Sequence, residues 1–206
     1  MPRRRRPPRE APRTLAEQIL VSLLDIRVLG DPVLRQETTI VDQVTPELRR
    51  LVDDMFETMY AAKGIGLAAP QVGRVERLSV IDVDDERFVL FNPEIIDSDA
   101  KRIKGEEGCL SIPEIYGDVE RSSRVVVRAM DIDGKRFEVE GRELLSRCLQ
   151  HEIDHLHGRL FIDYLSALKR RAATNKWAKE KDKYPGNIRR LTPSEVAAHH
   201  HRDEEL

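Results

Sequence analysis

A run of strand-like segments with helical segments before and after it constrains the fold of this 206-residue chain more than any other feature. Four segments rich in β-branched and aromatic residues are the strand candidates: 77–83, 87–93, 124–131 and 136–141. Asp133 and Gly134 separate the last two, and this dipeptide is typical of a tight hairpin turn. The order of a helix, several strands and two further helices predicts an α+β fold. We expect antiparallel β-sheets around one central helix, with another helix at the C-terminal end.

The spacing of apolar residues and the signals at segment ends indicate where the helices lie. Three helices are expected, at 45–64, 141–158 and 164–183. A further short helix is expected before them, at 14–24. In the first, Thr45 can cap the initial turn and Pro46 suits the first helical position. Gly64 is the residue expected to end that helix.

The length suits one folded domain with tails. We expect a disordered arm rich in Arg and Pro over 1–20, a folded domain over 21–184 and a loosely ordered tail over 185–206. The formal net charge of −2 gives the whole chain no basis for binding nucleic acid. No apolar run approaches the ~18 residues of a membrane-spanning helix. Two Cys residues do not indicate a disulfide framework, so we expect a cytoplasmic protein.

The helical segment 141–158 contains the pattern H-E-x-x-H at His151, Glu152 and His155. Residues four apart on a helix share a face, so the two imidazoles can hold one metal ion. Glu152 lies about 100° around the helix axis from His151, which places it beside that ion. Because a catalytic metal needs about three protein ligands and an open position, the third ligand must come from elsewhere in the chain.

Three positions can be compared as the source of that third ligand. Phe161 stands where one protease pattern has another His, and its side chain cannot bind a metal. Glu180 lies among lysines, where an ordinary solvated charge is the simpler interpretation. Cys109 lies between strand candidates and offers a thiolate, a strong ligand for such ions, although it could also be a small buried residue. This comparison favours Cys109.

Three segments resemble the signature motifs of the peptide deformylase family, in the same order: GIGLAAPQVG at 64–73, EEGCLSIP at 106–113 and QHEIDHLHG at 150–158. The resemblance extends from about Asp25 to about Lys183. It implies that Cys109, His151 and His155 bind the metal. It also implies a small α+β domain in which antiparallel sheets enclose the H-E-x-x-H helix.

The resemblance further implies the reaction, which is removal of the formyl group from nascent chains that begin with N-formylmethionine, with release of formate. Glu152 is expected to act as the general base on a metal-bound water. Gln71 can donate a side-chain N–H to the oxyanion, and the resemblance adds the backbone N–H of Leu110. It favours Fe²⁺ as the native ion, one per chain, while the ligand set also suits Zn²⁺, Ni²⁺ or Co²⁺.

Five residues are the candidates for substrate binding. Gly64 and Gly66 would allow the backbone of a substrate to approach closely. Ile65, Leu144 and Cys148 would form an apolar pocket for the methionine side chain. Arg147 lies four residues before His151, and its charge could alter the entrance of that pocket or extend outward. Asp154 is expected to form a salt bridge near the metal site, and His157 is expected to be solvated.

Two other functions remain open from the residues alone. One is a zinc endopeptidase that uses His151, His155 and Glu180. The other is a protein without catalysis, with a structural metal site or none, that docks on RNA or a ribosome. Five basic residues of the last expected helix could also hold a deformylase near the ribosome through phosphate contacts: Lys169, Arg170, Arg171, Lys176 and Lys179.

Overall fold

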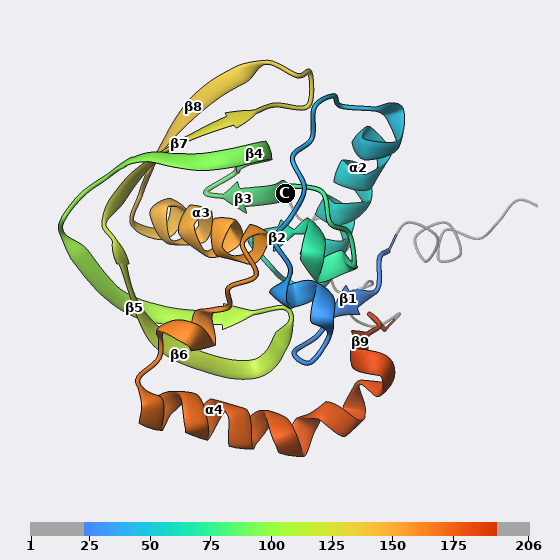
Figure 1. Ribbon diagram of the computed structural model, residues 1–206, viewed down its shortest axis with the longest axis vertical. Coiled ribbons are helices and arrows are strands. Elements are labelled where there is room, and N and C mark those ends of the chain that lie inside the picture. Colours follow the sequence, from blue (N-terminus) through green and yellow to red (C-terminus); the bar gives the residue numbers. More distant parts are fainter. Residues whose placement is uncertain (1–22, 193–206) are drawn as a thin grey trace, which may run out of the picture.

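The computed structural model describes residues 23–192 of the chain (Figure 1). The arm expected over 1–20 and most of the short helix expected over 14–24 therefore lie outside the described residues. The described residues form three antiparallel sheets, one of five strands and two of two strands. Helix α3, Glu143–Leu156, lies between the five-stranded sheet and one of the two-stranded sheets, which confirms the expected α+β class (Figure 1). Among these residues, no helix is both long enough and apolar enough to cross a membrane.

Helix α2 spans Pro46–Ala61 and begins as its sequence predicts. The hydroxyl of Thr45 accepts a hydrogen bond from the backbone N–H of Leu48 at 3.3 Å. The end of the helix differs from the expectation, because the residue with left-handed backbone is Lys63, at φ 59°, and not Gly64. A Cβ on Gly64 would lie 2.8 Å from Cδ1 of Leu110, so glycine at this position allows the Leu110 side chain to pack closely.

The larger sheet has five strands in the order β2, β3, β4, β7 and β8, with β2 at one edge. Strands β3, β4, β7 and β8 lie at the four strand candidates, and β2 was not expected. The bounds are β2 Gly66–Ala68, β3 Leu78–Val83, β4 Glu86–Ser98, β7 Arg124–Met130 and β8 Arg136–Arg142. Side chains alternate between the two faces of a strand. In β3, Leu78 and Val80 accordingly pack with α2, whereas Ile81 and Val83 pack with α3. The sheet therefore separates the two helices.

The second sheet is a long hairpin of two strands that the sequence pattern did not predict. Strand β5 spans Arg102–Cys109 and β6 spans Ile112–Ser122, so Cys109, which was expected between strand candidates, lies at the tip of this hairpin. Four of the eight residues of β5 are charged and two are glycines, and this hides the alternation of apolar and polar residues by which a strand is usually recognised. Figure 1 shows the hairpin curving around the side of α3 that faces α4.

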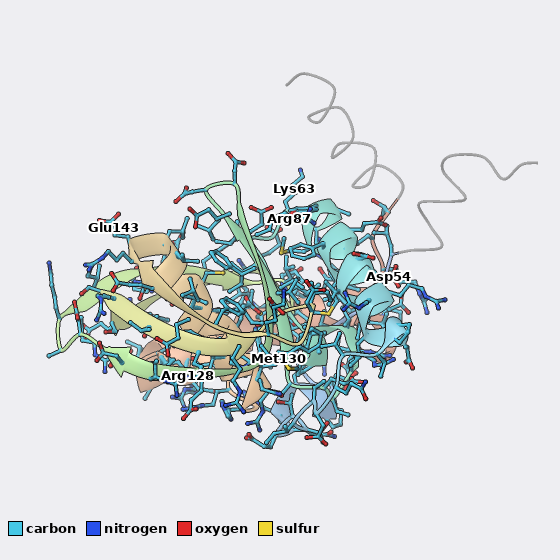
Figure 2. All side chains as sticks on the ribbon, turned by 90° about the horizontal axis from the view of Figure 1, so that it is seen from above. Asp54, Lys63, Arg87, Arg128, Met130 and Glu143 are labelled. Atoms are coloured by element: carbon cyan, nitrogen blue, oxygen red, sulfur yellow. The ribbon has the colours of Figure 1, made fainter. Side chains whose placement is uncertain are left out.

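Helix α3 spans Glu143–Leu156, and α4 spans Ala167–Glu180 on the outer side of the hairpin. Both helices agree with the sequence prediction. In Figure 2, Glu143 marks the outer end of α3, on the opposite side of the molecule from Asp54 of α2. The remaining ordered turns are short 3-10 segments: Pro32–Arg35, Ala69–Val72, Phe161–Tyr164, Lys181–Lys183 and Pro185–Asn187.

The C-terminal segment is ordered further than expected. Strand β9, Ile188–Arg189, pairs antiparallel with β1, Ile26–Arg27. Leu191 is also buried, in a cluster with Ile26. The loose tail expected from position 185 is therefore placed too early, because this segment closes onto the start of the described chain. A two-residue strand has too few residues for its pattern to be recognised in sequence.

The end of α3 generates a stability prediction. Gly158 has φ +66°, and a Cβ there would lie 2.7 Å from the backbone carbonyl of Arg35. Gly134 has φ +78° but nothing within 4 Å of such a Cβ, so it is a matched control. We expect Gly134→Ala to cost about 1–2 kcal/mol of unfolding free energy from backbone strain alone. We expect Gly158→Ala to cost that amount plus about 1–3 kcal/mol from the contact with Arg35. Urea unfolding measures both, and equal losses in the two variants would contradict the packing argument.

Candidate metal centre

The sulphur of Cys109 and one ring nitrogen of each of two histidines converge on one point. The Cys109 sulphur lies 3.3 Å from Nε2 of His155, which lies 3.2 Å from Nε2 of His151. A tetrahedral Zn²⁺ with ordinary bond lengths separates such ligand atoms by about 3.3–3.6 Å. The donor set and its spacing therefore fit a first-row divalent ion. Within the described residues, this is the only group of three or more potential ligands that is close enough to share an ion.

Two different elements bring these ligands together. His151 and His155 lie on successive turns of α3, as their spacing predicts, and Cys109 is the last residue of β5. Glu180 lies at the end of α4, where its carboxylate pairs with Lys183, and it is not among the residues that converge with the two histidines. The geometry therefore offers Cys109 as the third ligand and leaves Glu180 aside.

The orientation of His151 is fixed by a residue that the sequence reasoning missed. Nδ1 of His151 lies 3.0 Å from the Glu107 carboxylate, and Arg121 binds that carboxylate through two nitrogens at 2.9 and 3.0 Å. Burial alone would raise the pKa of Glu107, but the hydrogen bonds from His151 and Arg121 outweigh it and lower the pKa to about 2. Glu107 is therefore ionised and holds the imidazole with Nε2 toward the other ligands. Its position two residues before Cys109 in a strand was the available signal, since such residues share a face.

Asp154 and His157 have separate partners. Arg121 also donates to Asp154 at 2.5 Å, and the hydroxyl of Tyr164 donates to the same carboxylate at 2.7 Å. Asp154 is thus a buried salt-bridging residue, as expected. His157 is partly exposed at the end of α3, and its Nδ1 lies 2.7 Å from the carboxylate of the exposed Glu37.

Glu152 has a carboxyl group with an unusual environment. Its side chain is buried, and Oε2 has no hydrogen-bond partner among the described residues. Burial raises the pKa of Glu152 to about 7, with His151 acting in the opposite direction. Gly66 packs directly against it, because a Cβ on Gly66 would lie 2.4 Å from Oε1 of Glu152. The close approach for which Gly66 was singled out is therefore an approach to this carboxyl group and to the sulphur of Cys148.

The amide of Gln71 is held in a defined direction beside the ligands. Its oxygen accepts a hydrogen bond from the backbone N–H of Ala68 at 2.8 Å, which leaves its NH₂ group pointing the other way. That nitrogen donates to Ser111 Oγ at 3.2 Å and to the Cys109 sulphur at 3.5 Å. Gln71 is buried, so it is not a turn residue with its side chain in water.

A pocket of about 510 Å³ opens onto these groups. Its lining includes the five proposed substrate-binding residues together with Leu110: Gly64, Ile65, Gly66, Leu144, Cys148 and Leu110. Ile65 and Leu144 are partly exposed at its rim, whereas Cys148 is buried in its wall. Burial raises the pKa of the Cys148 thiol well above its usual range, so this sulphur stays protonated and is a poor metal ligand.

The arrangement combines the parts that metal-assisted hydrolysis needs. A thiolate and two imidazoles can hold an ion, a buried carboxyl group without a partner lies next to them, and an oriented amide donor reaches the same place. Cys109, His151, Glu152 and Gln71 line the pocket, whose walls combine apolar and charged side chains.

Comparisons with known proteins agree with this geometry. The family model described as Polypeptide deformylase matches residues 23–171. A peptide deformylase of Hydrogenovibrio crunogenus is 55% identical over 160 residues, which cover 76% of this chain and 94% of that protein. A crystal structure of a peptide deformylase from Legionella pneumophila is 48% identical, covers 78% of this chain and 96% of its own, and gives a TM-score of 0.74. A peptide deformylase from Ehrlichia chaffeensis in complex with actinonin gives a TM-score of 0.75 at 39% identity, over 77% of this chain and 98% of that one.

The ligand geometry generates a metal-binding prediction. We expect one Co²⁺ per chain to bind with a thiolate-to-metal absorption band and to raise the melting temperature, because a bound ion stabilises only the folded state. At a hundredfold excess over Kd the gain is about 2.7 kcal/mol. Cys109→Ala should lose the band and the stabilisation, whereas Glu180→Ala should keep both. Retention of both properties in Cys109→Ala would exclude this sulphur as a ligand.

Proposed function

This chain belongs to the peptide deformylase family and is a hydrolase that removes the formyl group from formylmethionine peptides, and we propose that the cluster of Cys109, His151 and His155 holds the ion at its active centre. The observation that carries the proposal is the convergence of these three ligand atoms, two of whose residues, Cys109 and His151, line the pocket together with Glu152. A divalent ion bound there supplies a water of lowered pKa and polarises the formyl oxygen.

Glu152 is proposed as the general base. Its buried carboxyl group has an oxygen without a partner, so it can accept the proton of the attacking water without first breaking another hydrogen bond. It then transfers that proton to the amine nitrogen as the bond between carbon and nitrogen breaks. The products are formate and a free amino terminus, and Glu152 returns to its starting state.

Gln71 and Leu110 are proposed to stabilise the oxyanion that forms on the formyl carbon. The NH₂ group of Gln71 is directed toward the ligand cluster by the hydrogen bond from Ala68 to its oxygen. The backbone N–H of Leu110 follows Cys109 directly in the loop between β5 and β6. Fixed donors of this kind need no reorientation as negative charge develops, which is why they lower the barrier.

The substrate is proposed to bind as an extended chain along β2. This strand is at the edge of its sheet, so within residues 23–192 one side of its backbone has no neighbouring strand. Gly64, Ile65 and Gly66 line the pocket beside it. Leu144 and Cys148 give the wall of α3 an apolar surface for the methionine side chain.

We propose Fe²⁺ as the native ion, one per chain, with Zn²⁺, Ni²⁺ or Co²⁺ able to occupy the same ligands. The thiolate makes an iron-loaded site sensitive to oxygen, because Cys109 is only partly buried and can be oxidised. Since nascent chains are its substrates, the enzyme is proposed to act in the cytoplasm. No observation favours an endopeptidase that uses Glu180 or a purely structural metal site.

Two substitutions test the assignment of roles. Glu152→Gln should slow formate release from a formyl-Met peptide by about 10²- to 10⁴-fold, because the base is lost while the ligands remain. Gln71→Ala should lower kcat by about 10²- to 10³-fold, because one oxyanion donor is lost. The assay uses protein purified without oxygen, with metal content measured for each variant. Full activity of Glu152→Gln at equal metal content would exclude its role as base.

Docking on the ribosome through α4 is a separate proposal. Within the described residues, three basic side chains of α4 are already bound inside the protein: Lys169 to Asp118, Arg170 to the carbonyl of Ile162, and Lys176 to the carbonyl of Glu114. Arg171 and Lys179 are exposed and have no ion pair in this part of the chain, so they remain available for phosphate contacts.

Charge reversal tests this proposal better than truncation, because truncation within α4 would remove the buried Trp177. The double variant Arg171→Glu with Lys179→Glu should co-sediment less with ribosomes. The dependence of log K on log salt should become shallower by about 1 for each phosphate that the variant no longer neutralises. The same reversal at Lys101 and Arg102, on the β5 side of the molecule, is the control. Equal sedimentation of both double variants would end the proposal.

A further inference from the structure

Arg147 lies in the α3 turn before His151, and its side chain does not extend into solvent. It is 14% exposed, and the guanidinium group is directed across to the β5–β6 hairpin. It donates to the carboxylate of Glu107 at 2.7 Å and to three backbone carbonyls of the hairpin, at 2.8–3.3 Å: Ile103, Gly105 and Val119. One side chain of α3 therefore binds both strands of the hairpin.

The backbone of the hairpin is shaped to receive this group. A Cβ on Gly105 would lie 2.8 Å from Nη2 and 3.0 Å from Cζ of Arg147, so only glycine allows the guanidinium to lie this close. Gly105 and Val119 are also partners across the two strands. The planar fork of Arg can reach several acceptors at once, which a Lys ammonium on a flexible stem cannot do in the same geometry.

The acceptors connect Arg147 to the ligand cluster in two ways. First, it donates a hydrogen bond to Glu107, whose carboxylate orients His151. Through the carbonyls, it fixes β5 and β6 against α3, and the tip of this hairpin carries Cys109 and Leu110. The thiolate ligand and the imidazole ligands come from these two elements, so their relative position depends on whatever holds the elements together.

We propose that Arg147 is a positioning residue that keeps the hairpin carrying Cys109 in register with the helix carrying His151 and His155, and thereby slows loss of the ion. Its guanidinium also borders the pocket, but the contacts that fix it face the hairpin. The inference rests on the metal site of the proposed function. It differs from a role in selecting substrate, which would act on the pocket and not on the ligands.

The test measures how fast the Co²⁺-loaded protein loses its ion to an excess of chelator, followed by the thiolate-to-metal absorption band. We expect Arg147→Leu to release the ion about 10- to 100-fold faster, because loss of groups that orient metal ligands has effects of that size. Arg147→Lys should fall between Arg147→Leu and the wild type. Gly105→Ala should also accelerate release, because it displaces the guanidinium while keeping its charge.

The matched control is Arg124→Leu. Arg124 on β7 is 20% exposed and forms ion pairs with Asp97, Asp99 and Glu140, at 2.8–3.4 Å, but it contacts neither the hairpin tip nor a ligand. We expect its loss to lower the melting temperature and to leave the release rate as in the wild type. Faster release in both Arg variants would show a general loss of stability and would overturn the specific role.

The remaining outcomes also decide the matter. Unchanged release in Arg147→Leu, with an altered KM or an altered preference among formyl-Met, formyl-norleucine and formyl-Leu peptides, would make Arg147 a pocket residue and overturn the proposal. If Arg147→Leu does not fold, unchanged release in Gly105→Ala overturns it equally. A wild-type protein that binds no Co²⁺ would instead refute the metal site itself, so failure of the proposed function is distinguished from failure of this inference.

Discussion

Helix α3 is buried on nearly every side although its last two turns are strongly polar. The structure around it must therefore supply partners for these buried polar side chains. The polar residues of those turns are all at least nine-tenths buried: Gln150, His151, Glu152, Asp154 and His155. Each buried polar group left without a partner costs about 1–3 kcal/mol, and more if it is charged. The surrounding sheets must therefore offer hydrogen-bonding groups as well as apolar surface.

Most of those groups come from the β5–β6 hairpin and the residue that ends it. Glu107 binds His151, Arg121 binds Asp154, and Ser122 exchanges two hydrogen bonds with Gln150. The hairpin therefore supplies the polar partners that the buried polar turns of α3 need. On the other face of α3, the five-stranded sheet packs apolar residues such as Ile81 and Val125 against Leu149 and Ile153.

Two buried atoms of α3 remain without a partner in the described part of the chain, Oε2 of Glu152 and Nδ1 of His155. Both belong to the proposed centre. The charges around it balance, with Arg121 and Arg147 facing Glu107 and Asp154. Ions removed from water gain little net stability from such pairing, but breaking one partner leaves an uncompensated charge. The network is therefore better understood as a device that fixes one arrangement of hairpin and helix than as a source of stability.

The sequence by itself determined the elements and residues that follow from local pattern. Helix α3 and its two histidines follow from a spacing of four, and four strands of the large sheet follow from their β-branched runs. The resemblance in three motifs identified the family. Cys109 was favoured as the third metal ligand because Phe161 cannot bind a metal and Glu180 lies among lysines. Only the tertiary structure decided that the segment around Cys109 is a hairpin tip, that Gly66 makes room for Glu152, and that Arg147 faces the hairpin and not solvent. A local pattern shows which face of an element a residue occupies, but its partner is set by how elements distant in the chain pack, and hydrogen bonds between buried charges exist only once that packing has formed.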